Sequence, residues 1–216
     1  MQQDKLLNDI ANDRTHGSTD LALLALDGIS KAANATDTVL LAAFQQRMQS
    51  LIRSLQSSRP SMVALNNLLE RVRLPISQFN SRDLKAYRKL IIDHCAEAKS
   101  FAREAQSQAV IEMVNQIKPG DVIMTHSISS TIKKVLSRLS KTRVHIIVTE
   151  SRPGDEGKVL AAYLVALGMR PTYITEAQIN LWMPRANKVV VGADALLEDG
   201  SIINKCGTSL MAMSAR

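Results

Sequence analysis

The sequence predicts an α/β protein in which an all-helical domain, residues 1–117, precedes a domain with a parallel β-sheet, residues 118–216. Apolar residues recur at helical spacings of three and four throughout the first half, and no run there is typical of a strand. After the turn KPGD at 118–121, short apolar runs alternate with helical segments. Such a β-α-β series favours a parallel sheet with right-handed crossovers.

The first half divides into successive amphipathic helices. The apolar spacing predicts helices over 18–33, over 36–58, from about residue 61 onward and, as a long last helix, over about 81–117. Ser18 or Thr19 is the expected N-cap of the first of these helices, and Thr36 that of the second. Arg59-Pro60 ends the second helix.

The second half is expected to hold four strands, over 122–126, 144–151, 170–176 and 188–194, with helices over 129–141, 156–169 and 177–186. Small polar or charged residues end each strand: THS at 125–127, TESR at 149–152, TE at 175–176 and GAD at 192–194. Ligands of open α/β sheets bind just beyond the carboxyl ends of the strands. This edge is therefore the predicted binding crevice.

The net charge of +7 comes from 27 basic and 20 acidic residues, and aromatic residues make up 3% of the chain. Because the basic residues are scattered and stacking platforms are scarce, direct nucleic-acid binding is disfavoured, and an anionic ligand or an acidic partner explains the charge as well. No apolar run reaches about 18 residues, so no membrane span is expected. The N-terminus lacks the apolar core of a signal peptide, which favours a cytoplasmic location.

Cys95 and Cys206 lie far apart and show no metal-ligand spacing. Reduced thiols are expected, with a disulfide as the alternative, and neither a metal site nor a cofactor is predicted.

Each candidate residue at the predicted crevice has a functional and a structural interpretation. The hydroxyls of Ser129, Ser130 and Thr131 precede or begin a helix, where they either bind an anion or cap the helix. Arg152 either grips a phosphate or pairs with a neighbouring acid of its own loop, Glu150 or Asp155.

Asp194 follows three valines at a predicted strand end. Its carboxylate either serves as a general acid or base, if burial raises its pKa, or anchors a loop. Lys205 follows a predicted hairpin turn at Asp199-Gly200 and would return a cation to the same crevice.

Together these segments resemble one family. The pattern GAD-x9-NK-x-GT, preceded in order by DRTHGSTDLALLAL, SSRPSMVALNN, IMTHSISSTIKKVL and ESRPGDEGK, is similar to the family of the alpha, beta and delta subunits of eukaryotic initiation factor 2B. That family includes ribose-1,5-bisphosphate isomerase and methylthioribose-1-phosphate isomerase. The resemblance implies a Rossmann-like second domain, self-association into at least a dimer and a phosphorylated ligand, either a sugar phosphate or a nucleoside monophosphate.

Family chains run beyond the position of Arg216 into a further helix and strand. The second domain is therefore expected to lack the last family elements, so that either a partner completes the sheet or its edge stays open.

The resemblance also assigns roles to residues. Asp194 matches the catalytic aspartate of the isomerases, and Ser127 occupies the position of its cysteine partner. The residues that match the ligand-binding pattern are Arg59, Ser129, Ser130, Thr131, Asn204 and Lys205, to which Arg152 is added as a candidate. His16, Gly17 and Ser18 stand where the isomerases carry an arginine-glycine-alanine phosphate motif.

Three departures from the isomerases argue against catalysis. A hydroxyl at Ser127 is far less acidic than a thiol, which titrates near ~8.5, and is a poor unassisted base. His16 is mostly neutral at pH 7, which weakens phosphate capture. Glu156 replaces the usual glutamine, and its carboxylate would repel a phosphate.

The sequence thus predicts an initiation factor 2B-related protein that binds a phosphorylated metabolite or a protein partner without catalysis. The alternative is an aldose–ketose isomerase that acts on a sugar 1-phosphate such as ribose 1,5-bisphosphate or methylthioribose 1-phosphate. It would use Asp194 with a proton relay through water or Ser127. A third hypothesis is an assembly subunit whose crevice is vestigial.

Overall fold

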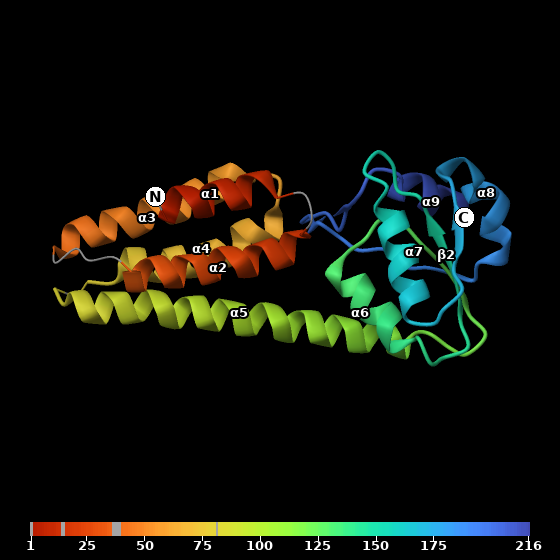
Figure 1. Ribbon diagram of the computed structural model, residues 1–216, viewed down its shortest axis with the longest axis horizontal. Coiled ribbons are helices and arrows are strands. Elements are labelled where there is room, and N and C mark those ends of the chain that lie inside the picture. The colour runs from red at the N-terminus through yellow and green to blue at the C-terminus, as the bar shows by residue number, and fades with distance from the viewer. Residues whose placement is uncertain (1, 14–15, 36–39, 81) are drawn as a thin grey trace. The chain divides into compact units, whose positions relative to one another are not determined.

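The computed structural model describes residues 2–13, 16–35, 40–80 and 82–216, and its chain divides into two compact units (Figure 1). Unit 1 comprises Met1–Ala105 and unit 2 comprises Gln106–Arg216. The division falls inside a long helix, whereas the sequence analysis placed it after residue 117, where that helix gives way to a turn. The predicted fold class, a helical first half followed by a parallel α/β half, is confirmed.

Unit 1 consists of helices whose apolar faces pack into one core. Its elements are α1 (Gln2–Asn12), α2 (Ser18–Ala35), α3 (Leu41–Ser58), α4 (Val63–Gln78) and the first part of α5 (Leu84–Asn115). Phe44 and Tyr87 are fully buried and meet edge to face with their ring centroids 6.1 Å apart. The Tyr87 hydroxyl donates a hydrogen bond to the Ile76 carbonyl, which satisfies its polar atom inside the core.

The expected cap of α2 is shifted by one residue. Ser18 is already the first helical residue, and the Gly17 carbonyl accepts from the N–H of Leu21. Gly17 therefore occupies the N-cap position, while Thr36 lies outside the described residues. None of the described helices combines the length and the apolar character that a membrane span requires.

Unit 2 is built on a parallel sheet in the order β3-β2-β1-β4. The strands are β1 (Val122–Thr125), β2 (His145–Thr149), β3 (Thr172–Ile174) and β4 (Lys188–Val189). The segments between them are α6 (Ser130–Arg138), α7 (Glu156–Ala166) and a run of short helices, η1 (Glu176–Gln178), α8 (Ile179–Trp182) and η2 (Met183–Arg185).

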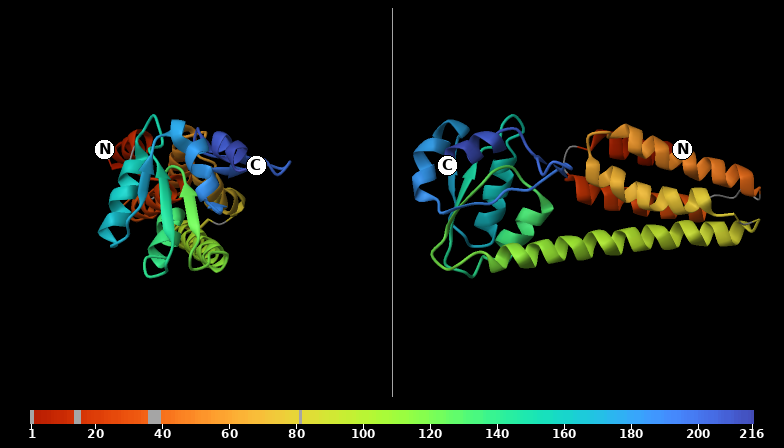
Figure 2. Two further views of the ribbon diagram at one scale, coloured as in Figure 1. Left: turned by 90° about the vertical axis from the view of Figure 1, so that its right-hand side faces the viewer. Right: turned by 180° about the vertical axis from the view of Figure 1, so that it is seen from behind.

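Alternating side chains of the central strands bury both faces of this sheet. Ile123 and Ile146 pack with α6, α7 and the end of α5, whereas Met124 and Ile147 pack with α8, η2 and the last helix, α9 (Thr208–Ser214). Figure 2 shows helices on either side of the sheet. Since both faces are covered, a ligand site on this sheet has to lie in the loops that follow the carboxyl ends of the strands, where Thr125 and Thr149 are themselves buried.

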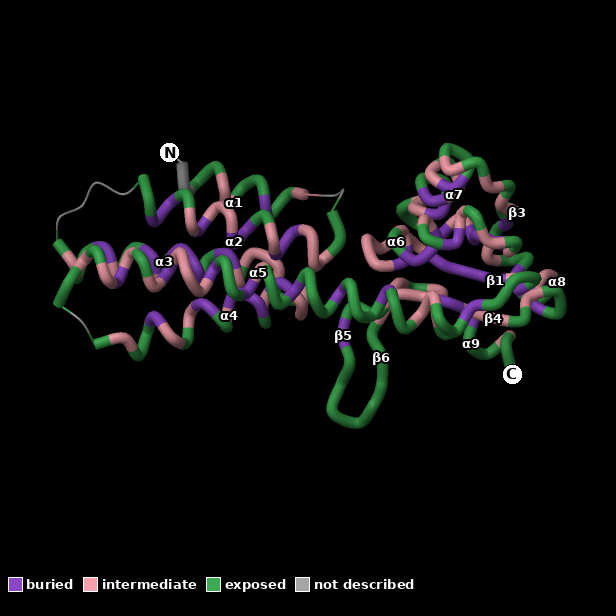
Figure 3. Tube along the Cα trace, turned by 90° about the horizontal axis from the view of Figure 1, so that it is seen from below, coloured by how far each residue is buried: buried purple, intermediate pink, exposed green. Residues whose placement is uncertain are grey.

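The predicted strand over 188–194 was too long. β4 ends at Val189, and the ladder to β1 closes where the N–H of Val190 donates to the Met124 carbonyl. The chain then leaves the sheet because Asp194 joins a hairpin, in which its N–H donates to the Ile203 carbonyl. The hairpin pairs β5 (Ala195–Leu196) with β6 (Ile202–Ile203) and is largely exposed (Figure 3).

Candidate functional site

The loops that follow the four parallel strands form one face of unit 2. We call these loops, residues 126–129, 150–155, 175–176 and 190–194, together with the 204–208 loop, the strand-end face. Three residues on it, Ser127, Ser151 and Asp155, have positive φ angles of 65°, 65° and 55°, and they are the non-glycine residues of this kind in the described part of the chain. Such conformations cost energy and cluster at functional sites.

His126 connects three parts of the strand-end face. Its side chain is fully buried, its Nδ1 lies 2.6 Å from the Thr149 hydroxyl, and its Nε2 lies 2.6 Å from the Cys206 carbonyl. Because a carbonyl can only accept, Nε2 carries the proton and donates it to Cys206. Gly207 lies against the same ring, where a Cβ atom would come within 2.8 Å of Nε2. The imidazole thus fixes the 204–208 loop to the ends of β1 and β2.

Hydrogen bonds also hold Ser127 and Ser151 in place. The Ser127 N–H donates to the Ser151 hydroxyl, and the Ser151 N–H donates to a Glu176 carboxylate oxygen, both at 2.6 Å. Both nitrogens of His126 are engaged elsewhere, so neither is left to take a proton from Ser127. Desolvation, followed by the nearby charge of Glu176, raises the pKa of Glu150. The face therefore carries negative as well as positive groups.

The three hydroxyls at the start of α6 have partners within unit 2. The Ser129 hydroxyl caps the helix by accepting from the Ile132 N–H at 3.1 Å. Gln106, a buried residue of α5, donates to the hydroxyls of Ser130 and Thr131 at 2.9 and 3.2 Å. A hydroxyl that accepts a bond still has its own proton to donate. Ser130 and Thr131 can therefore offer hydrogen bonds to an anion.

The 204–208 loop is internally bonded and carries a cation of the face, Lys205. Asn204 donates to the Thr208 hydroxyl at 3.0 Å, and that hydroxyl donates to the Lys205 carbonyl at 2.7 Å. The Lys205 ammonium pairs with Glu156, the first residue of α7. A Cβ on the next residue, Gly157, would come within 1.7 Å of the Thr149 carbonyl, so only glycine allows α7 to start here.

The side chains of Asp194 and Arg152 differ in their hydrogen-bond and ion-pair partners. The Asp194 carboxylate is exposed and has no hydrogen-bond or ion-pair partner among the residues that the structure describes. Arg152 is exposed too, but it donates to Asp155 at 2.7 Å, as in the structural interpretation of this residue. That carboxylate raises the pKa of the Arg152 guanidinium.

The remaining predicted residues belong to unit 1. His16 contacts Asp13 through its N–H and through Nδ1, both at 2.7 Å. Arg59 donates to the carbonyls of Ile10 and Asp13 at the end of α1. The Ser18 hydroxyl is buried and finds no hydrogen-bond partner among the described residues. These contacts give Arg59 a structural task within the helical unit.

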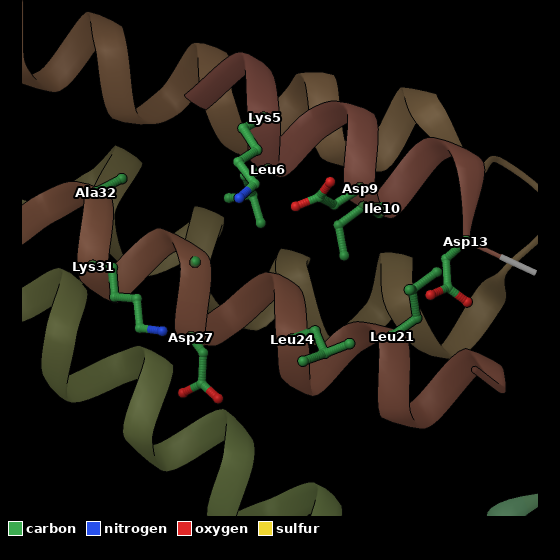
Figure 4. A pocket seen from close by; sticks show the side chains of 11 residues that line it. Lys5, Leu6, Asp9, Ile10, Asp13, Leu21, Leu24, Asp27, Lys31 and Ala32 are labelled. Carbon is green, nitrogen blue, oxygen red and sulfur yellow. The ribbon is translucent and has the colours of Figure 1, made fainter. Parts of the chain in front are cut away.

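Unit 1 also has a groove of about 370 Å³ between α1 and α2 (Figure 4). Buried Ile10 and Leu21 and exposed Lys5 and Asp9 line it, and Asp27 on its edge pairs with Lys99. None of the predicted ligand-binding residues lines this groove. We therefore base the candidate site on the strand-end face.

In the described part of the chain, no cluster of three or more His, Cys, Asp or Glu could hold a metal ion. Cys95 is buried and Cys206 exposed, and both thiols are free, so the disulfide considered as an alternative is not formed.

Comparison with known proteins places this geometry in a family. The sequence profile of the Initiation factor 2 subunit family matches residues 14–216. A ribose 1,5-bisphosphate isomerase of Haloferax volcanii is 30% identical over 93% of this chain and 62% of its own length. A putative translation initiation factor eIF-2B subunit 2-like protein of Pyrococcus horikoshii is 32% identical over 97% of this chain and 72% of its own length.

Among solved structures, the translation initiation factor eIF-2B of Pyrococcus horikoshii OT3 superimposes with a TM-score of 0.84 at 29% identity. The match covers 98% of this chain and 73% of that protein. The chain thus spans less than two thirds of the length of the Haloferax isomerase and about three quarters of the solved factor. Sequence profile, relatives and fold agree: this chain belongs to the initiation factor 2 subunit family.

Proposed function

We propose that the strand-end face of unit 2 binds a sugar phosphate of the kind that ribose 1,5-bisphosphate isomerases process. The observation that carries this proposal is the convergence on buried His126 of the 204–208 loop and the ends of β1 and β2. Hydroxyl protons of Ser130 and Thr131 and the ammonium of Lys205 are suitable donors for phosphate oxygens. Arg152 and Asn204 are further proposed ligand contacts on this face, and His16, Gly17, Ser18 and Arg59 of unit 1 stay predictions from the sequence.

Aldose–ketose isomerisation is the activity to test first, because several relatives at about 30% identity bear the name ribose 1,5-bisphosphate isomerase. This activity is the alternative that the sequence predicts after binding without catalysis, and the named relatives favour it over binding alone. Isomerisation of a sugar 1-phosphate breaks the ring bond between C1 and O4, and the proton of the C2 hydroxyl ends on O4 while C2 becomes the carbonyl. A proton also moves from C2 to C1, and the overall formula stays unchanged. Asp194, whose carboxylate is free of partners in the described chain, would carry that proton.

Binding without catalysis is the second candidate, and the hydroxyl of Ser127 favours it. A serine cannot readily supply the second ionisable group that the family cysteine provides. The Ser127 N–H is held by Ser151, which fixes the backbone without making the side chain more acidic.

The two candidates separate in one assay. Purified protein is incubated with ribose 1,5-bisphosphate or methylthioribose 1-phosphate, and ketose product is measured for the wild type, Asp194→Asn and Ser127→Cys. Turnover that Asp194→Asn abolishes would establish the isomerase. No wild-type turnover, with saturable binding of the same sugar phosphates, would establish the second candidate. If the thiol is the missing group, Ser127→Cys should then form ketose product at a rate at least about 10²-fold above the detection limit.

We also propose that the chain self-associates through unit 2 into at least a dimer. Leu196, Ile202 and Ile203 on the β5–β6 hairpin are exposed, and large exposed apolar side chains in one region favour an interface. Light scattering should give at least twice the monomer mass, and a monomer at all concentrations would refute this.

A further inference from the structure

The ion pair between Lys205 and Glu156 lies within the proposed sugar-phosphate site. Lys205 belongs to the 204–208 loop, and Glu156 opens α7. Their side chains are only 23% and 30% exposed, so the pair is partly shielded from water. The cation that a phosphate would seek is therefore already matched by a carboxylate of the same unit, and the start of a helix is a position that favours that negative charge.

Only one of the two carboxylate oxygens of Glu156 is used in this pair. Oε1 accepts from Lys205, whereas Oε2 is enclosed and has no hydrogen-bond partner among the described residues. Gly154 lies against the same carboxylate, where a Cβ atom would come within 2.6 Å of Oε1. Buried carboxylate oxygens in proteins are nearly always hydrogen bonded. Oε2 is thus an acceptor without a donor, and a ligand hydroxyl can satisfy it once the Glu156 carboxylate turns toward the ligand.

We propose that Glu156 determines the specificity of this site by accepting a hydrogen bond from a hydroxyl of the ligand. Resting on the proposed sugar-phosphate function, the inference is that Lys205 meets an anionic oxygen while Oε2 of Glu156 accepts from a hydroxyl of the same molecule. A hydroxylated phosphate ester supplies both groups. A phosphate ester without hydroxyls is repelled by the Glu156 carboxylate and forms no hydrogen bond with it. The site therefore binds such an ester more weakly.

The preference is measurable with two phosphate esters of similar length. Ribose 5-phosphate carries several hydroxyls and n-pentyl phosphate carries none, and at pH 8 both phosphates are dianions without a proton to donate. Calorimetric titration of the wild type should show ribose 5-phosphate binding at least about tenfold more tightly than n-pentyl phosphate, the value of one charge-assisted hydrogen bond.

Two variants test whether Glu156 is the cause. Glu156→Gln keeps the shape and removes the charge, so n-pentyl phosphate should bind at least about fivefold more tightly than to the wild type. Glu156→Ala removes the acceptor, and the preference for ribose 5-phosphate should fall to within about twofold. Glu198→Gln is the matched control, because it removes an exposed carboxylate of the same unit and should change neither affinity.

The failure of this inference differs from a failure of the proposed function. A wild type that binds both esters equally, or a preference that persists in both Glu156 variants, would overturn the role of Glu156 while leaving a sugar-phosphate site in place. Absence of any binding of ribose 1,5-bisphosphate to the wild type would remove the site and the inference together. Thermal melting of each variant near the wild-type temperature shows that the comparison is made on folded protein.

Discussion

The core of unit 1 and the strand-end face of unit 2 differ in how many polar side chains they bury and in backbone strain. Apart from the hydroxyls of Tyr87 and Ser18, the buried polar and charged side chains among the described residues belong to unit 2, at Gln106, Asp121, Thr125, His126, Thr149 and Ser151. So do the non-glycine residues with positive φ. Burying polar groups and straining the backbone both oppose folding. Four of these buried residues, Thr125, His126, Thr149 and Ser151, and the strained residues lie at the strand ends, which indicates that this face is shaped for a ligand, whereas the core of unit 1 serves stability.

The largest expected effect on stability comes from the core of unit 1. Phe44→Ala removes a fully buried ring that packs on Tyr87, and the free energy of unfolding should fall by about 3–5 kcal/mol. Urea unfolding followed by circular dichroism measures this loss. The folded fraction should still bind ribose 1,5-bisphosphate with wild-type affinity. Loss of binding in folded protein would break the proposed division of roles.

Gly157→Ala changes unit 2 instead, at the start of α7 beside the strand-end face. Its new methyl group would meet the Thr149 carbonyl, so the start of α7 must shift and carry Glu156 with it. We expect about 1–3 kcal/mol lower stability and at least about tenfold weaker sugar-phosphate binding, measured by thermal melting and calorimetry. Ala162→Ser, on the exposed side of α7, is the control. If Gly157→Ala binds the sugar phosphate as tightly as the wild type, the start of α7 does not contribute to the binding site.

Thr149→Val tests the buried imidazole with a smaller change. Valine keeps the shape of threonine but removes the hydroxyl 2.6 Å from Nδ1 of His126, leaving that buried nitrogen with the longer 3.5 Å contact to the Ser151 hydroxyl. The free energy of unfolding should drop by about 1–3 kcal/mol. Nitrogen NMR of the His126 ring should still report a proton on Nε2, because the Cys206 carbonyl remains. A proton moved to Nδ1 would contradict the tautomer assigned above.

The smallest effect concerns Asp121, away from the strand-end face. The Lys118 N–H donates to its carboxylate and, with Lys188 and Asn187, lowers the pKa of Asp121. A lowered folded-state pKa stabilises the protein above the unfolded value near ~4 and loses this effect as the pH falls through the folded value. The melting temperature of Asp121→Asn should lie below that of the wild type at pH 7, and the difference should shrink below about pH 4. A difference in melting temperature that stays constant across this pH range would show that the charge of Asp121 does not contribute to stability.

Local patterns in the sequence predicted the sheet and the polar strand ends because both depend on residues close together in the chain. The partners of those residues were not predictable in the same way. His126 meets Cys206, and Ser130 meets Gln106, across long stretches of chain that no spacing rule connects. The strand over 188–194 was overestimated because its end is drawn into the hairpin by Ile203.

The departures from the isomerase pattern were visible in the sequence, but their physical meaning was not. Glu156 was expected only to repel a phosphate, and its pairing with Lys205 and its unpartnered oxygen emerge from the fold. Arg59 likewise matched a ligand pattern, while its guanidinium donates to two backbone carbonyls of unit 1.

Calorimetric titration of ribose 1,5-bisphosphate into the wild type and Lys205→Met tests the proposed site most directly. We predict one saturable site in the wild type and at least about tenfold weaker binding in Lys205→Met, because the ammonium of the strand-end face is lost. Equal affinity in the two proteins, or no binding to either, would contradict the assignment of this face as a sugar-phosphate site.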